Sequence, residues 1–246
     1  MKECKQGRIH SIETFGTVDG PGIRYVLFLK GCPFRCLYCH NPDTWDMTKG
    51  SLMTVDEVSR DLKKYSRYVD GITISGGEPL LQLDFVTELF KKVKQDGFST
   101  CLDTSGAIFN EKDENLKRKL LECLKFCDLV MLDIKHIDEN KHKMLTGHSN
   151  KNVLDFARFL SAKNIDVWLR YVLVPTINDD QESLGKWREF KDTLTNVKKV
   201  ELLPYHTLAI PKYEELGIEY KLKGIAEPSK EQIKKAKEIL GIGEDL

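Results

Sequence analysis

The sequence predicts an α/β fold in which helices cover a parallel sheet. Six segments that read as strands alternate with helical segments, and the connections between them are short. The strand segments are nearly continuous apolar runs, which is typical of parallel strands buried on both faces. This pattern fits a doubly wound sheet and an open or closed barrel equally well. In each case ligands bind at the carboxyl ends of the strands, so the polar residues after each strand are the functional candidates.

The elements follow one another in a regular order. The first strand is expected at residues 25–29, an apolar run between two glycines, and a long polar loop over residues 31–50 follows it. The capping box Thr54-x-x-Glu57 then starts a helix with its apolar residues on one side. The later elements are expected as strand 71–75, helix 83–94, strand 98–103, helix 116–126, strand 129–134, helix 153–163, strand 166–174, helix 184–194, strand 200–203 and a final helix at about 229–240.

Length and composition indicate one folded domain. At 246 residues the chain can bury a substantial core, and 41% hydrophobic with 31% charged residues is ordinary for a globular protein. We find no linker, low-complexity tract or repeat of fixed period. We therefore expect a single domain over residues 1–246, in which residues 1–24 lead into the first strand.

Charge and motif content argue against several classes of function. Lys plus Arg (38) balance Asp plus Glu (38), whereas binding to nucleic acid or anionic membranes depends on a basic surface. No apolar run approaches the roughly 20 residues of a membrane span, and the N-terminus lacks the apolar core of a secretory signal. No P-loop or dinucleotide-binding glycine motif is present. We expect a cytoplasmic protein with mostly reduced cysteines and no nucleic-acid or membrane partner.

Three cysteines share the loop after the first expected strand. Cys32, Cys36 and Cys39 are spaced C-x3-C-x2-C, so three thiolates can converge without long-range folding. Soft thiolates select zinc, copper(I) or iron–sulfur clusters. Structural zinc requires four ligands, and His40 follows Cys39 too closely to ligate the same ion without strain. In a four-iron cluster, which usually has four cysteine ligands, three cysteines leave one iron open to another ligand.

These motifs resemble the radical S-adenosylmethionine superfamily and, within it, the activases of glycyl-radical enzymes. The run Ser75-Gly76-Gly77-Glu78-Pro79 matches the superfamily's G-G-E-P motif, where glycines let the backbone approach a ligand closely. Residues 40–75 contain no cysteine, as in activases without a ferredoxin-like insertion. The resemblance extends from about residue 7 to about residue 240 and rests on G-R-I-H-S-I-E-T-F-G-T-V-D-G-P-G-I-R, C-L-Y-C-H-N-P-D-T-W-D, C-L-D-T-S-G, L-V-M-L-D-I-K-H, W-L-R-Y-V-L-V-P and E-L-L-P-Y-H.

The resemblance implies a fold, a chemistry and partners. The fold is a partial (β/α)6 TIM-like barrel, and the cofactors are a [4Fe–4S] cluster and S-adenosylmethionine. The activity is that of an oxidoreductase: reductive cleavage of S-adenosylmethionine gives methionine and a 5′-deoxyadenosyl radical, which abstracts a glycine Cα hydrogen. The implied protein substrate is pyruvate formate-lyase, in anaerobic glucose metabolism, with flavodoxin or ferredoxin as electron donor and the activase as a monomer. Activation of another glycyl-radical enzyme and a zinc-stabilised module without catalysis are the alternatives.

The resemblance also assigns site residues. The cluster would be held by Cys32, Cys36 and Cys39. S-adenosylmethionine would contact Tyr38, Cys39, His40, Asn41, Gly77, Asp133, Ile134, Lys135 and His206. A sodium or potassium ion would bind Asp103, Thr104, Met131 and Asp133. The protein substrate would contact Asp19 and Arg170.

Several of these residues carry charges that would need partners if they were buried. Asp103 and Asp133 cannot share an apolar barrel mouth without compensating charge, which Lys135, the cofactor or a cation can supply. An ordinary salt bridge between Lys135 and an aspartate is the simpler alternative. A buried Arg170 needs an anion. Glu78 either contacts the ligand or supports its own loop.

The remaining cysteines and histidines have structural interpretations. Cys101 is expected in the core, Cys123 and Cys127 on one helix and also in the core, and Cys4 as an exposed thiol. We expect ordinary structural roles for His10, His136, His142 and His148.

Overall fold

The computed structural model describes residues 5–243. These residues form two compact units. The first contains the chain up to Pro33 and Thr44–Met131, and the second contains Phe34–Asp43 and the chain from Leu132 onward. The prediction for Cys4 lies outside the described residues, and the single domain stays a prediction. Residues 34–43, which belong to the second unit, are part of the loop that carries the cysteines.

The sheet of the first unit combines antiparallel and parallel pairing. Strand β1 pairs antiparallel with β2 and β3, whereas β2, β4 and β5 pair in parallel. The order is β3-β1-β2-β4-β5, followed by the first part of β6. Because parallel strands end at one edge, the residues after β4 and β5 come together there. The strands are β1 (Gln6–Gly16), β2 (Arg24–Leu29), β3 (Ser51–Thr54), β4 (Gly71–Gly76), β5 (Ser99–Thr104) and β6 (Leu129–Asp133), which runs into the second unit.

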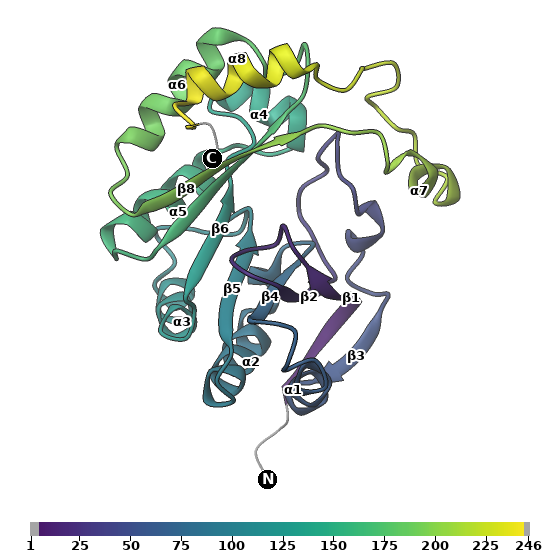
Figure 1. Ribbon diagram of the computed structural model, residues 1–246, viewed down its shortest axis with the longest axis vertical. Helices are drawn as coiled ribbons and strands as arrows, with labels where there is room; N and C mark the ends of the chain where they lie inside the picture. Colours follow the sequence, from purple (N-terminus) through teal and green to yellow (C-terminus); the bar gives the residue numbers. More distant parts are fainter. Residues whose placement is uncertain (1–4, 244–246) are drawn as a thin grey trace. The chain divides into compact units, whose positions relative to one another are not determined.

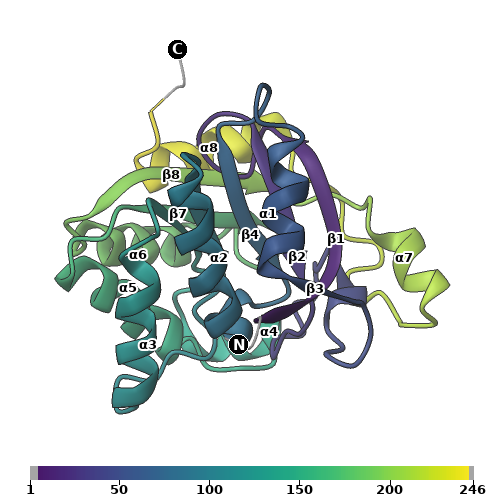
Figure 2. The ribbon, with the colours of Figure 1, turned by 90° about the horizontal axis from the view of Figure 1, so that it is seen from below.

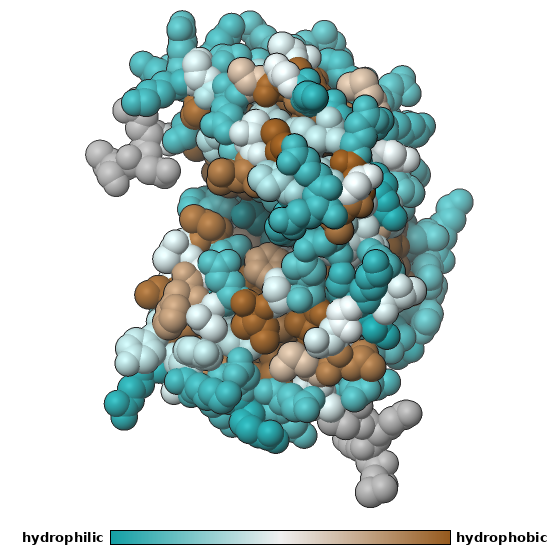
Figure 3. Space-filling model, turned by 90° about the vertical axis from the view of Figure 1, so that its right-hand side faces the viewer, coloured by the Kyte–Doolittle hydropathy of each residue, from teal (hydrophilic) through white to brown (hydrophobic). Residues whose placement is uncertain are grey.

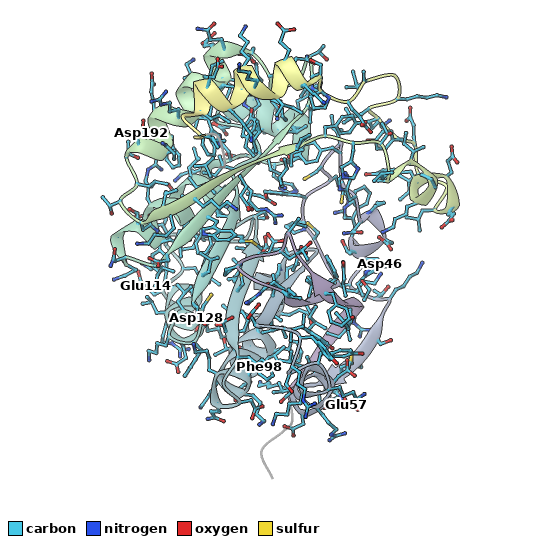
Figure 4. All side chains as sticks on the ribbon, viewed as in Figure 1. Asp46, Glu57, Phe98, Glu114, Asp128 and Asp192 are labelled. Carbon is cyan, nitrogen blue, oxygen red and sulfur yellow. The ribbon has the colours of Figure 1, made fainter. Side chains whose placement is uncertain are left out.

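Three helices of the first unit lie in a row, with α2 between α1 and α3 (Figures 1 and 2). Each buries one apolar side; in α2 it includes Phe85, Leu89 and Val93. The predicted capping box is present at α1, where Glu57, labelled in Figure 4, bonds back to Thr54. The helical elements are α1 (Val55–Lys63), α2 (Leu83–Gln95) and α3 (Glu114–Leu124), with the 3-10 turns η2 (Pro79–Gln82) and η1 (Pro42–Thr44), which crosses the boundary between the units.

The second unit contains the end of β6 and the parallel pair β7 and β8. The face of β7 that bears Tyr171 is covered by α6, because Tyr171 contacts Trp187 at 5.6 Å between ring centroids. Helix α8 packs against α6 (Figure 1). The elements are α4 (Glu139–Thr146), α5 (Lys151–Ala162), β7 (Val167–Leu173), α6 (Gln181–Asp192), β8 (Val197–Pro204), α7 (Ile210–Glu215) and α8 (Lys230–Leu240).

All six predicted strands are present, as β2 and β4 to β8. Within residues 5–243, two strands and two α-helices were not predicted, nor were the 3-10 turns η1 and η2. Strand β1 alternates buried and exposed residues rather than forming an apolar run, β3 has only four residues, and α4 and α7 are short. One prediction was wrong: Cys127 does not share a helix with Cys123, because α3 ends at Leu124.

None of the helices in residues 5–243 is long and apolar enough to cross a bilayer. On the face shown in Figure 3, hydrophilic residues predominate and hydrophobic residues form separate small areas.

Candidate functional site

The loop that carries Cys36 and Cys39 is held by its backbone. The amide of Cys39 donates to the Cys36 carbonyl at 3.1 Å, and the amides of Arg35 and Leu37 donate to carbonyls at the end of α4. Cys32 lies in the part of the loop that belongs to the first unit. All three cysteines are thiols rather than half-cystines. The predicted cluster ligands therefore follow one another along a loop that has fixed backbone contacts.

Cys36 is a buried thiol. Burial raises its pKa to about 12, although the nearby Lys135 acts in the opposite direction. Metals bind the thiolate rather than the thiol, so metal binding at Cys36 would release a proton.

Lys135 joins two of the predicted cofactor residues. Its ammonium group lies 3.1 Å from the Asp133 carboxylate and 5.6 Å from the centre of the Tyr38 ring. Burial opposes the charged form, but Asp133, Tyr38 and Cys36 raise the pKa of Lys135 well above its usual value. The ion pair that the sequence suggested as the simpler alternative is thus present, and it lies beside Tyr38.

Ile134, between these two charges, is fixed by its backbone. Its amide donates to the Arg170 carbonyl at 3.2 Å, and its carbonyl accepts from the Trp187 indole at 3.2 Å. Both backbone groups are therefore in use, and its side chain is fully buried.

His40 and His206 lie against each other. Their ring centroids are 3.9 Å apart at an interplanar angle of 31°. Burial, and to a smaller extent the neighbouring His206, lower the pKa of His40 to about 4. His40 Nε2 and His206 Nδ1 are buried and, among residues 5–243, find no hydrogen-bond partner; the same holds for the Tyr38 hydroxyl. Since buried polar groups are normally paired, these three atoms could pair with polar groups of a ligand.

Asn41 has a partner that the sequence did not reveal. Lys212 of α7 donates to its side-chain oxygen at 2.7 Å, and the same ammonium group lies 3.9 Å from Asp43. Lys212 is 171 positions away in the chain, and α7 is too short to stand out by periodicity.

In the first unit, Gly77 packs directly on another stretch of backbone. Its amide donates to the Leu29 carbonyl at 2.9 Å, and the amide of Glu78 donates to the Gly31 carbonyl at 2.6 Å. A Cβ on Gly77 would overlap the Gly31 carbonyl oxygen. Glycine is therefore required at position 77, because the two backbones approach each other closely there. This contact explains the second glycine of the G-G-E-P motif.

Glu78 is fully buried and accepts four hydrogen bonds. Thr104 Oγ1 and Ser105 Oγ donate at 2.5 Å each, and the amides of Ser105 and Leu80 donate at 3.1 Å. Burial raises its pKa, and the hydrogen bonds counteract this effect. Of the two interpretations of Glu78, these contacts favour the supporting one: it ties the turn after β4 to the residues after β5.

The residues predicted to bind a cation are divided between the two units. In the first unit Asp103 accepts from Ser75 Oγ at 2.6 Å, the Thr104 hydroxyl is bound to Glu78, and Met131 is fully buried in β6. In the second unit Asp133 is paired with Lys135. Each polar side chain of the predicted set thus has a protein partner.

The two predicted substrate contacts also have protein partners. The Asp19 carbonyl accepts from Thr73 Oγ1 at 2.6 Å, while Arg170 Nε lies 3.5 Å from Glu201 on β8. The anion that a buried Arg170 requires is therefore Glu201.

Within residues 5–243, no three His, Cys, Asp or Glu side chains are arranged to hold a single metal ion.

Comparisons with known proteins identify a family. Residues 26–187 match the model of the radical SAM superfamily. The chain is 49% identical over 236 residues to the pyruvate formate-lyase-activating enzymes of Staphylococcus epidermidis and of Staphylococcus aureus USA300, which covers 94% of this chain and of each relative.

Solved structures support the fold. A domain of the pyruvate-formate lyase-activating enzyme from Bacteroides vulgatus superposes with a TM-score of 0.57 at 24% identity, covering 70% of this chain and 92% of that one. The radical SAM methyltransferase from Sphaerobacter thermophilus gives 0.59 at 15% identity, covering 89% of this chain and 63% of that one. The predicted α/β fold of the partial-barrel type is confirmed.

Proposed function

The chain belongs to the radical SAM superfamily and to its pyruvate formate-lyase-activating enzymes, and we propose that it installs a glycyl radical on pyruvate formate-lyase. The observation that carries this proposal is 49% identity over 94% of both chains to relatives of that name, together with the C-x3-C-x2-C loop of thiols. When bound, a reduced [4Fe–4S] cluster supplies one electron to cleave S-adenosylmethionine into methionine and a 5′-deoxyadenosyl radical, which takes a hydrogen atom from a glycine Cα of the partner.

The residues of this chain bind and orient. Cys32, Cys36 and Cys39 would each give one thiolate, and the Cys36 proton must leave when the thiolate binds iron. Three protein ligands would leave one iron available to the amino and carboxylate groups of S-adenosylmethionine. The buried and unpaired polar atoms of Tyr38, His40 and His206 would pair with the bound nucleoside.

Other residues would fix the methionine part and its charges. The Gly77 backbone would approach the amino group, and Lys135, held by Asp133 at 3.1 Å, would face the carboxylate. Asn41 and Ile134 complete the proposed contacts. Glu78 acts as a positioning residue, because its four hydrogen bonds hold the G-G-E-P turn against the residues after β5.

Several finer assignments belong to the same proposal. A sodium or potassium ion would bind Asp103, Thr104, Met131 and Asp133. To do so, it would have to compete with the protein contacts that the polar side chains of this set already make. Asp19 and Arg170 would contact the protein substrate. We propose flavodoxin or ferredoxin as electron donor, a monomer, and a cytoplasmic location.

The test is electron paramagnetic resonance on anaerobically reconstituted, reduced protein, with and without S-adenosylmethionine. We expect a cluster signal that changes when S-adenosylmethionine is added, and loss of that signal when Cys36 or Cys39 is replaced by alanine. A colourless protein that holds one zinc ion, or a signal indifferent to S-adenosylmethionine, would refute the proposal. Radical transfer only to a different glycyl-radical enzyme would correct the choice of partner.

A further inference from the structure

The last turn of helix α4 contacts the loop that carries Cys36 and Cys39. The amide of Arg35 donates to the Thr146 carbonyl at 2.8 Å, and the amide of Leu37 donates to the Leu145 carbonyl at 3.0 Å. These carbonyls belong to the last two residues of α4, and carbonyls at a helix end have no partner within the helix. Two amides on either side of Cys36 therefore complete the end of α4.

An aromatic contact accompanies these hydrogen bonds. Phe34 is buried, with its ring 5.5 Å from that of His142, at an interplanar angle of 74°, and 5.5 Å from that of His148. His142 lies on α4 and is fully buried. The Phe34 ring thus contacts two histidines, one within α4 and one just after its end.

Polar contacts fix the two histidines. His142 Nδ1 lies 2.7 Å from the His148 carbonyl, and Thr146 Oγ1 lies 2.9 Å from the His142 carbonyl and accepts from the His148 amide at 3.2 Å. Gly147 ends α4 in the left-handed conformation, with φ of 84°, which lets the chain turn back to His148. His142 Nδ1 is therefore the donor to the His148 carbonyl, and this bond closes the turn around Phe34.

From these contacts we infer that the end of α4 is a template for the cysteine loop, with Phe34 and His142 as its positioning residues. This inference rests on the proposed function, because it concerns the capacity of Cys36 and Cys39 to retain an iron–sulfur cluster. Neither Phe34 nor His142 ligates the cluster. They act through the backbone, since loss of the ring contact frees the Arg35 and Leu37 amides from the α4 carbonyls. Groups that orient metal ligands typically alter metal affinity by about 10- to 100-fold.

The test compares Phe34→Leu and His142→Leu with Phe156→Leu. Phe156 is a fully buried ring of α5 in the same unit and stacks on Phe159 of its own helix, so its replacement by leucine is a matched loss of core packing. His142→Asn is the conservative variant, because its side-chain amide can still donate to the His148 carbonyl.

Two readouts are used, and the first needs no cluster. Hydrogen exchange in the apo protein should be about tenfold faster at the Arg35 and Leu37 amides in Phe34→Leu and His142→Leu, and unchanged in Phe156→Leu. After anaerobic reconstitution, loss of cluster absorbance to a ferrous chelator should be about tenfold faster in the same two variants. His142→Asn keeps a donor to the His148 carbonyl but loses the ring contact with Phe34, so its exchange should lie between that of the wild type and that of His142→Leu.

The outcomes separate the template from the proposed function. Wild-type exchange and release rates in Phe34→Leu and His142→Leu would overturn the template, as would an equal acceleration in Phe156→Leu. A wild-type protein that takes up no cluster would overturn the proposed function, while the exchange measurement would still decide whether α4 holds the loop.

Discussion

The Glu78 carboxylate accepts a hydrogen bond from Thr104 Oγ1 at 2.5 Å. Glu78 lies just after β4, and Thr104 is the last residue of β5. This bond therefore joins the carboxyl ends of two neighbouring strands. Glu78 has three further donors, and its carboxylate has no basic partner among them. The G-G-E-P turn is therefore held by four hydrogen bonds to one buried carboxyl group.

Replacing Glu78 by glutamine should destabilise the apo protein, because an amide would set its own donors against the donors that surround it. The expected cost is about 2 kcal/mol, which lowers the melting temperature by roughly 4–8 °C. Thermal unfolding measures the effect. Thr104→Val is the control, since it removes one donor and should cost about 1 kcal/mol. Equal melting of Glu78→Gln and wild type would show that the carboxylate does not support the turn.

Thr176 has a positive φ of 66°, an unfavourable conformation for a β-branched residue. Its side chain is exposed, and its amide donates to Asp179 at 2.8 Å, a bond that glycine would keep. Thr176→Gly should stabilise the protein by about 1 kcal/mol and raise the melting temperature by roughly 2–4 °C. Asn164→Gly, at φ of 52°, should gain less, because asparagine tolerates this conformation. A lower melting temperature for Thr176→Gly would contradict the assignment of strain.

Stability of the apo protein should fall on mild acidification. Burial lowers the pKa of His142 to about 4, whereas an unfolded histidine titrates near 6.5. Between these values the unfolded state binds the extra proton, so the free energy of unfolding decreases as the pH falls through this window. Urea unfolding at several pH values measures the slope. His142→Asn should reduce it by up to about 1.4 kcal/mol per pH unit, and an unchanged slope would show that His142 does not contribute.

His206 should contribute to binding of S-adenosylmethionine without contributing to the cluster. His206→Ala removes a buried ring nitrogen that finds no hydrogen-bond partner among residues 5–243. We expect about tenfold weaker binding of S-adenosylmethionine by equilibrium titration, since one hydrogen bond is lost, with unchanged iron content. His10→Ala, on β1, is the control. Loss of iron in His206→Ala would instead indicate a role for this histidine in holding the cluster.

The sequence predicted local features more reliably than contacts between distant residues. The capping box at Thr54, the strand before Cys32 and the glycines of G-G-E-P depend on residues close together in the chain, and each was identified. The Glu78 contacts with Thr104 and Ser105, the Asn41 contact with Lys212 and the contact between the His40 and His206 rings depend on long-range folding. No periodicity or spacing indicates them. Helix α4 was missed because its eight residues have only a weak amphipathic pattern.

The anticipated ion pair of Lys135 shows the limit in another way. Charge balance predicted that Lys135 or a cation would compensate an aspartate. The structure selects Asp133 as the partner and places Tyr38 beside the ammonium group. The charges in the sequence indicate that an aspartate needs a positive partner. They do not indicate whether Lys135 pairs with Asp103 or with Asp133, because that choice depends on how the chain folds.

The most direct test of the central claim is the formation of a glycyl radical on purified pyruvate formate-lyase. The protein would be reconstituted anaerobically, reduced, mixed with S-adenosylmethionine and the partner, and followed by electron paramagnetic resonance. We predict a glycyl-radical signal on pyruvate formate-lyase that requires S-adenosylmethionine and is abolished by alanine at Cys32, Cys36 or Cys39. Radical formation that persists in all three alanine variants would contradict the account.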